Sequence, residues 1–371
     1  MLGYGVDVTV DEIARRLVTQ YGHSVDVWTP TTDGTFADAP YNLREIIVYG
    51  APVNRVLPLL ELNACTALRK LRRRLSAEGA RYDVVVPCTH PYYGVGRVLN
   101  APDVFFNFGN VPTAGFSWKG KLNWAWLDFS ERAVHKPRAR AVASISCFLH
   151  DQQSAAVRTK GRVIYLGGDH YGTADPTDAA ARQASRQAAR HVLGLPADAV
   201  LLGFCGRLHK QHPPYKGTQV LLDMAEWLAA RQSAAKLVMC GIGSPDDEAW
   251  ISGRAAIPLA NLPPARMPLF YDALDVYVCA STWEGFNLPI VEAAWHGVPA
   301  VAYDAGAHRE HVTAALAAAG NQDELFSEAA RLAGDAALRV SLSAQAWQRA
   351  QQFSWDECAR QFEQLLREVA E

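Results

Sequence analysis

Two glutamates eight positions apart, Glu284 and Glu292, lie in a segment that follows an apolar run. Pro289 suits the first position of a helix and Gly297 the position after its last residue, which predicts a two-turn helix over residues 289–296. The free backbone N–H groups and the positive dipole end of such a helix bind phosphate groups. Because two carboxylates would repel a phosphate, we assign them to ribose and hexose hydroxyl groups on either side of it. The alternative is that Glu284 caps the helix and Glu292 is exposed.

Two cations, Arg207 and Lys216, lie in the segment 203–217, which begins at the end of another apolar run. If that run is a strand, both follow its carboxyl end, the edge at which open α/β sheets bind ligands. A guanidinium fork and an ammonium there would neutralise a departing diphosphate where negative charge develops. Lys210 is an alternative to Lys216, and a solvated basic loop without a ligand is an alternative to both.

Short β-branched or apolar runs alternate with longer helical patterns, as parallel α/β layers require. The runs are continuously apolar, which is typical of strands covered by helices on both faces. They fall into two series and predict two doubly wound sheets, with a domain boundary in the turn-forming segment Gly172–Arg182. The first series is His23–Thr29, Arg44–Tyr49, Asp83–Cys88, Val104–Phe108, Ala141–Ser146 and Arg162–Leu166; the second is Val200–Cys205, Lys236–Cys240, Asp275–Ala280 and Pro299–Tyr303.

Both ends of the chain have helical patterns. Helical periodicity begins near Thr9, which leaves only Met1–Asp7 for the strand that should precede the first helix. We therefore expect either that the true start lies upstream or that this domain has an unusual sheet. At the other end, Ala336–Ala370 is helical with an interruption near Phe353, where Ser354 could cap a last helix.

The composition excludes several classes of protein. With 36 Lys and Arg against 38 Asp and Glu, the formal charge is −2, which disfavours a nucleic-acid partner. The 7 cysteines are far apart, and we interpret them as reduced core residues. No apolar stretch approaches the ~20 residues of a membrane span, and the N-terminal segment lacks the apolar region of a signal peptide. We therefore expect a cytoplasmic protein.

These segments, taken in order, resemble the C-terminal domain of the retaining glycosyltransferases of family 4, which have the GT-B fold. The E-x7-E signature with its flanking Gly-Phe and Leu-Pro is specific, and the match covers most of residues 198–312. The N-terminal half matches more weakly, and residues 353–355 resemble the start of the family's final helix. The motifs are Gly206-Arg207…Lys216-Gly217, Gly241-x-Gly243, Ser281-x-x-Glu284-Gly-Phe-x-Leu-Pro-x-x-Glu292-Ala, Gly297-x-Pro299 and Gly306…Glu310.

The resemblance implies two Rossmann-like domains that face a cleft. Residues 1–172 would form the acceptor-binding domain and residues 173–353 the nucleotide-sugar-binding domain. Residues 354–371 would form a final helix that crosses back toward the N-terminal domain.

The resemblance also implies roles for individual residues. Arg207 and Lys216 would bind the diphosphate of a UDP- or GDP-sugar, and with Glu284, near the transferred sugar, they would form the catalytic group. Glu292 would accept hydrogen bonds from the ribose hydroxyls. The family generally needs no metal and no cofactor beyond the donor itself. The remaining donor-site residues would be Gly5, Gly206, Phe286, Asn287 and Leu288.

Two positions depart from the family's pattern. Asn287 replaces the glycine commonly found in that loop, so the backbone there is less free to approach a sugar closely. Family members often carry a His just after the fifth strand, where this chain reads Asn107-Phe108-Gly109-Asn110. His90, Asn107 or Asn110 would then supply the missing polar contact on the acceptor side, although a lone His is more often structural.

Aromatic and basic residues gather between Phe116 and Trp126, and Trp118 and Lys119 are acceptor-side candidates among them. Aromatic faces suit sugar rings, and lysines suit an anionic group. The alternative is a Trp-rich helix packed into the core.

Leu68–Arg81 has three leucines on one helical face with Arg and Lys around them. Such a helix could rest on an anionic membrane, although more often its leucines pack on a sheet. His209 and His212 lack further ligands nearby for a metal site.

The function that these patterns predict is transfer of a sugar from a nucleotide diphosphate donor to an acceptor hydroxyl, with retention of configuration. A non-catalytic nucleotide-sugar binder is one alternative. A dinucleotide-dependent oxidoreductase using NAD is the other, although neither Gly-x-Gly pair completes the G-x-G-x-x-G motif.

Overall fold

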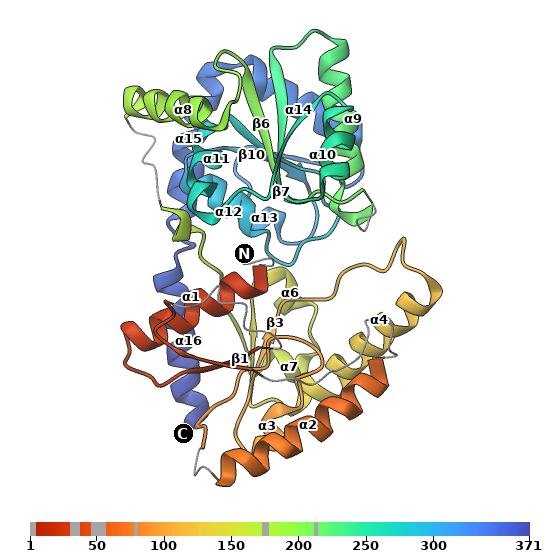
Figure 1. Cartoon of the computed structure of the whole chain (residues 1–371), viewed down its shortest axis with the longest axis vertical. Coiled ribbons are helices and arrows are strands. Elements are labelled where there is room, and N and C mark those ends of the chain that lie inside the picture. The colour runs from red at the N-terminus through yellow and green to blue at the C-terminus, as the bar shows by residue number, and fades with distance from the viewer. Residues whose placement is uncertain (1–4, 30–37, 46–56, 78–80, 173–177, 211–213) are drawn as a thin grey trace. The chain divides into compact units, whose positions relative to one another are not determined.

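The computed structural model describes residues 5–29, 38–45, 57–77, 81–172, 178–210 and 214–371. Its contacts divide the chain into two units. We call Leu166–Trp355 the C-terminal unit, and Leu2–Tyr165 together with Asp356–Glu371 the N-terminal unit. Each is an α/β unit whose paired strands are all parallel, which confirms the predicted class of two Rossmann-like domains (Figure 1).

The division between the units falls at 165/166, whereas the sequence placed it at 172/173. The reason is that the segment after Leu166 packs within the C-terminal unit. A Cβ on Gly167 would lie 2.2 Å from the backbone nitrogen of Trp355, and Gly168 N–H donates to Phe353 O at 3.0 Å. Residues 173–177 of the expected linker lie outside the described residues.

The C-terminal unit is built on six parallel strands in the order β11-β10-β9-β6-β7-β8. Chain order therefore runs from β6 outward to β8, and then restarts at β9 on the other side of β6. The two central strands pair through Leu202 with Val276 and Gly203 with Tyr277. The strands are β6 Val200–Arg207, β7 Ala235–Ile242, β8 Ala256–Ala260, β9 Val276–Cys279, β10 Ala300–Tyr303 and β11 Ala315–Ala317.

Helices cover both faces of this sheet, as the continuously apolar strands predicted. Apolar residues of α9, α10 and α14 pack on one face, and those of α8, α11 and α12 pack on the other (Figure 1). The helices are α8 Ala179–Leu193, α9 Thr218–Ala230, α10 Pro245–Ser252, α11 Met267–Ala273, α12 Leu288–Trp295, α13 His308–His311, α14 Gln322–Gly334 and α15 Ala336–Ala350, with the short turns η2 Asp169–Tyr171, η3 Pro214–Lys216 and η4 Pro264–Arg266.

The two edge strands of this sheet, β8 and β11, were not predicted. Strand β8 contains Pro258, and an edge position tolerates proline because its missing N–H is needed by no outer neighbour. Strand β11 is a three-residue run, Ala-Leu-Ala, with no β-branched residue to mark it.

The N-terminal unit carries a two-stranded parallel sheet, β1-β2, and a three-stranded parallel sheet, β3-β4-β5. The predicted strand Asp83–Cys88 is absent from the described strands as such; only Val85 forms an isolated bridge, with Asp103. The strands are β1 Asp26–Thr29, β2 Asn42–Glu45, β3 Val104–Asn107, β4 Ala141–Ser144 and β5 Gly161–Val163. The predicted run Arg44–Tyr49 continues beyond β2 into residues outside the described ones.

The helices of the N-terminal unit begin with α1, which starts four residues before the predicted Thr9. Two helices end the chain: α15 stops at Ala350 and α16 starts at Trp355, which confirms the predicted interruption near Phe353. The helices of this unit are α1 Gly5–Thr19, α2 Leu57–Ala77, α3 Val95–Leu99, α4 Trp118–Ser130, the π-helical turn η1 Glu131–His135, α5 Lys136–Arg138, α6 Cys147–Asp151, α7 Ala155–Arg158 and α16 Trp355–Ala370, whose first residue belongs to the other unit.

None of the three leucines of α2 whose side chains the structure describes is exposed, as insertion of this face into a membrane would require. Leu68 and Leu75 are buried, and Leu71 is half-buried. The arginines beside them are exposed, so the outer face of the helix is basic rather than apolar. Among the described residues, no helix is both long and apolar enough to cross a membrane.

One buried charge network joins α8 to the central strands of the C-terminal unit. The Asp275 carboxylate accepts from Arg190 Nη2 at 2.6 Å and from the backbone N–H of Leu201 at 2.7 Å. Arg186 approaches the other carboxylate oxygen at 3.3 Å. Both Arg190 and Asp275 are buried, so removing one partner leaves an uncompensated charge.

We expect Asp275→Ala to lower the free energy of unfolding by about 3–5 kcal/mol, because Arg190 would remain buried without its carboxylate. Asp198→Ala is the matched control at an exposed site of the same unit, and should change stability by less than about 0.5 kcal/mol. Denaturant unfolding of the full chain measures both. Equal effects of the two substitutions would show that the network does not stabilise the unit.

Candidate functional site

The order of the strands creates a place for a ligand at the carboxyl edge of the C-terminal unit's sheet. Because the chain proceeds from β6 to one side and later restarts at β9 on the other, the loops after these two neighbours leave in opposite directions. Arg207 is the last residue of β6, and Lys216 ends the turn η3 in the loop that follows. Glu284 lies in the loop after β9. The structure thus places all three proposed catalytic residues at one topological switch point.

Lys216 and Glu284 form an ion pair across these two loops. The ammonium Nζ lies 2.8 Å and 3.1 Å from the two carboxylate oxygens, and the glutamate is buried. Burial alone would lower the pKa of Lys216, but the charge of Glu284 outweighs it and raises that pKa. Glu284 is therefore paired with a lysine, and it does not cap α12, which was the alternative from the sequence.

Arg207 lies close enough to Tyr215, the neighbour of Lys216, for its charge to affect the pKa of that tyrosine. Burial raises the pKa of this tyrosine, and the positive charges of Lys216 and Arg207 oppose that rise. The guanidinium itself is exposed. Lys210, the alternative cation, is directed elsewhere: its Nζ lies 5.9 Å from the ring centroid of Trp250. This contact favours Lys216 over Lys210 as the second cation of the site.

Close backbone packing fixes the loops that carry the pair. Gly217 has a φ of +69° and follows Lys216 directly; a Cβ there would lie 2.2 Å from Ala280 O. Gly306 has a φ of +58°, and a Cβ on it would lie 2.2 Å from Glu284 O. Any larger side chain would push the loops apart. The two glycines therefore allow the loops after β6, β9 and β10 to meet backbone to backbone.

Helix α12 starts directly beside this packed region. It spans Leu288–Trp295, which confirms the predicted helix with both bounds one residue earlier. Asn287 precedes it with φ 77° and ψ 68°, in the left-handed region that favours glycine. The candidate Phe286 is buried against His311, with ring centroids 4.3 Å apart. The backbone N–H groups at 286–288 thus belong to a fixed loop.

A hydrogen-bonded group holds Asn287 in its left-handed conformation. Its amide Nδ2 lies 2.9 Å from His308 Nε2 and 3.3 Å from Cys279 Sγ. His308 Nδ1 lies 2.7 Å from Tyr303 O, so Nδ1 must carry a proton, and when the ring is neutral its Nε2 is an acceptor. The asparagine therefore donates to both neighbours, and its side chain anchors the loop.

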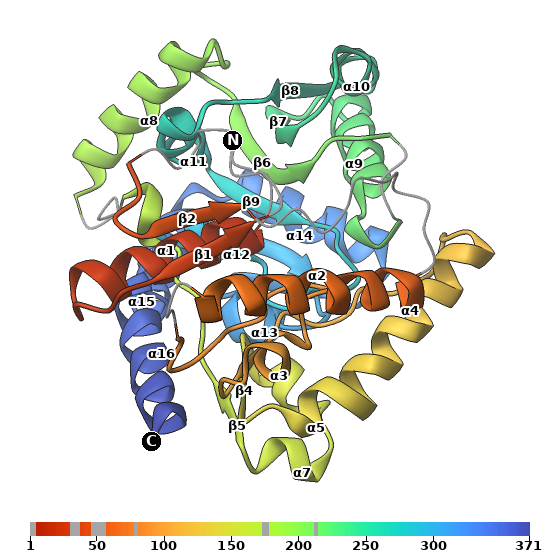
Figure 2. The ribbon, with the colours of Figure 1, turned by 60° about the horizontal axis from the view of Figure 1, so that its bottom comes forward.

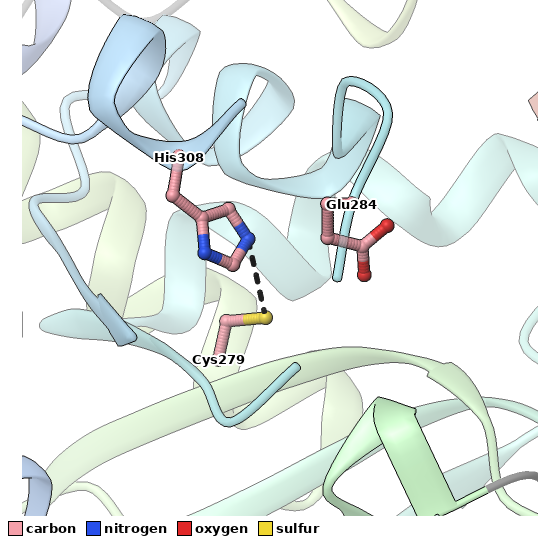
Figure 3. A group of neighbouring side chains, drawn as sticks. All are labelled: Cys279, Glu284 and His308. Carbon is pink, nitrogen blue, oxygen red and sulfur yellow. Dashed lines mark hydrogen bonds between the residues drawn. The ribbon is translucent and has the colours of Figure 1, made fainter. Parts of the chain in front are cut away.

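Cys279, Glu284 and His308 offer ligand atoms that lie within 4.8 Å of one another, the kind of spacing a metal ion needs (Figure 3). The side chains do not fit one well as they stand. Figure 3 shows Sγ and Nε2 facing each other, while the Glu284 carboxylate points away from them. That carboxylate contacts Lys216 with both oxygens, and the Asn287 amide contacts the other two atoms. An ammonium and an amide thus occupy the donor atoms.

Glu292 is buried one turn into α12, so the alternative that it is exposed is wrong. Its carboxyl accepts a hydrogen bond from the Tyr271 hydroxyl, and His170 Nε2 lies 3.4 Å from its other oxygen. The indole N–H of Trp355 donates to His170 Nδ1 at 3.0 Å, so the proton of the neutral imidazole is on Nε2, toward the glutamate. Burial raises the pKa of Glu292 to about 7, although the Tyr271 hydrogen bond opposes the rise.

The sequence did not predict Tyr271 and His170 as the neighbours of Glu292. Tyr271 lies on α11 and His170 in the turn η2, segments that carry no recognisable motif. Only their place in the fold identifies them. Gly206, the remaining candidate on β6, pairs with Gly241 of β7, and a Cβ on Gly241 would lie 1.6 Å from Gly206 O.

The remaining candidates belong to the N-terminal unit. Gly5 begins α1, where its carbonyl accepts from Thr9 Oγ1 at 2.7 Å. His90 precedes a cis Pro91, and its ring lies 6.2 Å from that of Tyr93. Asn107 is buried at the carboxyl end of β3, with Nδ2 donating to Ser144 Oγ at 3.0 Å, and this is the edge where an acceptor is expected.

Asn110 and the aromatic segment lie farther along the same loop and helix. Asn110 Nδ2 donates to Asp128 Oδ1 at 3.2 Å. Trp118, the first residue of α4, is 68% exposed, and Lys119 Nζ lies 5.6 Å from its ring centroid. Trp118 is therefore not a core residue, which favours a surface role over the packed-helix alternative. His212 lies outside the described residues, and His209 Nδ1 lies 2.9 Å from Asp247 Oδ2.

Comparison with known proteins identifies two matching segments. Residues 199–335 match the family described as "Glycosyl transferases group 1", and residues 4–170 match "Glycosyltransferase Family 4". A D-inositol 3-phosphate glycosyltransferase of Thermobispora bispora is 30% identical, over 99% of this chain and 90% of that protein. Enzymes of the same name from Corynebacterium urealyticum and Saccharomonospora viridis are 31% and 33% identical, and the alignments cover 49% and 47% of this chain but only 46% and 44% of those relatives' lengths.

Solved structures share the fold of the whole chain at low identity. Anabaena HepE, solved with UDP and glucose, superposes with a TM-score of 0.72 at 18% identity and covers 98% of this chain and 96% of its own. Sucrose-phosphate synthase from Thermosynechococcus elongatus superposes with a TM-score of 0.74 at 19% identity, covering 99% and 94%. These neighbours establish the GT-B arrangement as the fold class.

The anchoring of Asn287 predicts an energetic coupling with His308. We expect His308→Ala to cost about 1 kcal/mol less in an Asn287→Gly background than alone, because glycine adopts the left-handed conformation unaided and leaves no buried amide without its acceptor. Urea unfolding of the four proteins in the cycle measures this coupling. The matched control is Asn261→Gly, at another left-handed asparagine, which should be additive with His308→Ala. Additivity in both cycles would contradict the anchor.

The buried Glu292 predicts a pH dependence of stability. An unfolded glutamate loses its proton near pH 4.5, but in the folded state burial holds the proton up to about pH 7. The free energy of unfolding should therefore fall between about pH 4.5 and 7, by on the order of 3 kcal/mol, through this group. The difference in stability between wild type and Glu292→Gln, followed across this range, isolates the contribution of Glu292.

Tyr271→Phe serves as the second variant for this pH dependence. Losing the hydrogen bond that lowers the pKa of Glu292 should move the fall in stability to higher pH. A wild-type curve parallel to that of Glu292→Gln would show that Glu292 is already ionised in the fold at acidic pH.

Proposed function

Because this chain belongs to the glycosyltransferases of family 4, we propose that it moves a sugar from a nucleotide diphosphate sugar to an acceptor hydroxyl with retention of configuration. The observation that carries the proposal is the Lys216–Glu284 ion pair, placed beside Arg207 at the switch point of the sheet. A cation for the leaving group and a carboxylate for the sugar thus stand within one hydrogen-bonded unit. The donor would be UDP- or GDP-linked.

The donor's diphosphate would bind between Arg207 and Lys216. A lysine ammonium has three N–H donors, and two suffice for the Glu284 carboxylate, so the third can bind a phosphate oxygen. The exposed guanidinium of Arg207 would supply the bidentate contact that phosphate geometry favours. Backbone N–H groups at Phe286, Asn287 and Leu288 would contribute further donors, with Gly206 lining the site.

The two glutamates would hold the hydroxyl groups of the donor. Glu284, paired with Lys216, would accept hydrogen bonds from the transferred sugar. Glu292, with its proton retained to near neutral pH, would bind the ribose hydroxyls both as acceptor and as donor. Catalysis would rest on positioning and on stabilising the negative charge that develops as the glycosidic C–O bond breaks, a task the two cations could fulfil in place of a metal ion.

The acceptor would bind at the carboxyl edge of the β3-β4-β5 sheet, near Asn107 and Asn110, with His90, Trp118 and Lys119 as further candidates. The named relatives act on D-inositol 3-phosphate. We therefore propose a hydroxyl of a phosphorylated polyol or sugar as the acceptor, and the cytoplasm as the place of reaction.

Arg207 is the residue whose loss should affect turnover most cleanly. We expect Arg207→Ala to lower kcat by about 100-fold, because it removes charge stabilisation of the leaving diphosphate. Lys210→Ala removes a cation of the same loop that lies near Trp250 instead, and should change kcat by less than about threefold. Release of UDP or GDP from the matching nucleotide sugar, in the presence of an inositol phosphate acceptor, measures both rates. A large loss in Lys210→Ala alone would reassign the cation.

Thermal-shift measurements with UDP, GDP, their sugars and NAD separate the remaining alternatives. Stabilisation by a nucleotide sugar together with turnover supports the transferase. Binding without turnover across acceptors would indicate a non-catalytic nucleotide-sugar protein, and stabilisation by NAD alone would indicate an oxidoreductase.

A further inference from the structure

A cavity of about 480 Å³ lies within the N-terminal unit, where α2, α3, α4 and η1 meet. Figure 2 shows α2 passing α3 and approaching α4. Two arginines of α2, Arg69 and Arg72, and one of α3, Arg97, line the cavity together with Trp126 and His135. Its volume falls within the range of small-molecule sites, about 300–1,000 Å³. The proposed transferase site does not use these residues.

The charges around this cavity are unbalanced. Among the described residues, the lining holds three guanidinium groups and no carboxylate. Arg97 is attracted by Asp103, which lies outside the lining. Glu131, in the adjacent turn, is buried and already paired with Lys136, whose Nζ lies 3.0 Å from its carboxylate. Three arginines that line one cavity raise the local potential, and an anion would offset it.

The remaining walls of the cavity give it shape and an apolar surface. Trp126, Ser130 and Val134 follow one another at four-residue intervals and so share one face of the helix. Trp126 is half-buried, and the His135 ring packs against Tyr93 with centroids 5.6 Å apart. An aromatic face beside guanidinium groups suits a ligand that joins a phosphate to a ring or an apolar chain.

The cavity lies away from the carboxyl edge of the β3-β4-β5 sheet. Helix α3 ends at Leu99, shortly before β3 begins at Val104, and η1 ends at His135, shortly before β4 begins at Ala141. These elements therefore meet at the amino edge. Asn107, at the other end of β3, marks the carboxyl edge where we propose the acceptor.

We propose that this cavity is a second anion site, which binds the phosphate group of a ligand whose ring or chain lies against Trp126. Arg72 and Arg97 would grip the phosphate from two helices, and Arg69 would add a third contact. Phosphate of this kind is carried by soluble phosphorylated compounds and by lipid headgroups alike, and the two sources are distinguished by experiment. Because Leu68 and Leu75 of α2 are buried, a lipid would be recognised through its headgroup and not by insertion of this part of the helix.

The test compares two neighbouring arginines of α2 in the full chain. Arg72→Gln removes a lining charge, whereas Arg73→Gln removes the same charge from an exposed residue outside the lining. Both are made in an Arg207→Ala background, so that the proposed donor site contributes little. The probes are pyrophosphate and glucose 6-phosphate, followed by calorimetry, and vesicles of phosphatidylcholine with or without phosphatidylglycerol, followed by co-sedimentation.

We expect Arg72→Gln, and independently Arg97→Gln, to weaken binding of one probe by about tenfold or more, with Arg73→Gln within about twofold. If this pattern appears with the soluble phosphates, the ligand is a soluble compound; if it appears only with phosphatidylglycerol vesicles, it is a headgroup. Equal losses in Arg72→Gln and Arg73→Gln would overturn the proposal, because binding would then reflect net charge alone. Absence of binding to every probe would overturn it as well. Circular dichroism of each variant confirms that the exposed substitutions leave the fold intact.

Discussion

The ion pair between Lys216 and Glu284 is the interaction on which the rest of the C-terminal unit's site depends. It joins the loop after β6 to the loop after β9, two segments that the strand order sends in opposite directions. The loop after β6 could not approach the loop after β9 if Gly217 carried a side chain, and the loop after β10 could not meet Glu284 if Gly306 did. Close backbone packing at the two glycines brings the loops together, and the ion pair then holds their side chains in position.

The two glutamates of the signature illustrate how environment separates identical side chains. Glu284 has a cationic partner, Lys216, within hydrogen-bond distance. Glu292 has a phenol and an imidazole around it and no described cation in contact, and burial lets it keep its proton to near neutral pH. Two carboxyl groups in such different surroundings can serve different parts of one substrate.

Much of this architecture was predictable because it is local in sequence. The apolar runs of β6, β7, β9 and β10 predict strands by themselves, and Pro289 in the first turn of α12 and Gly297 after its end mark that helix. What failed depended on distant partners. His170 reaches Glu292 only because Trp355, far along the chain, fixes its ring. Likewise, the run Asp83–Cys88 has the composition of a strand, yet among the described residues only its Val85 forms a bridge, with Asp103. The basic cavity forms only when α2, α3 and α4 are folded together, so no single segment of the sequence could predict it.

The left-handed Asn287 also has a consequence for how this sequence can change over generations. While position 287 holds asparagine, position 308 must hold a side chain that can accept a hydrogen bond from the Asn287 amide. Replacement of Asn287 by glycine would remove this requirement at position 308. If position 308 changed first, the intermediate would carry an Asn287 amide without its acceptor. The two positions should therefore covary among descendants of this chain, with the substitution at 287 coming first.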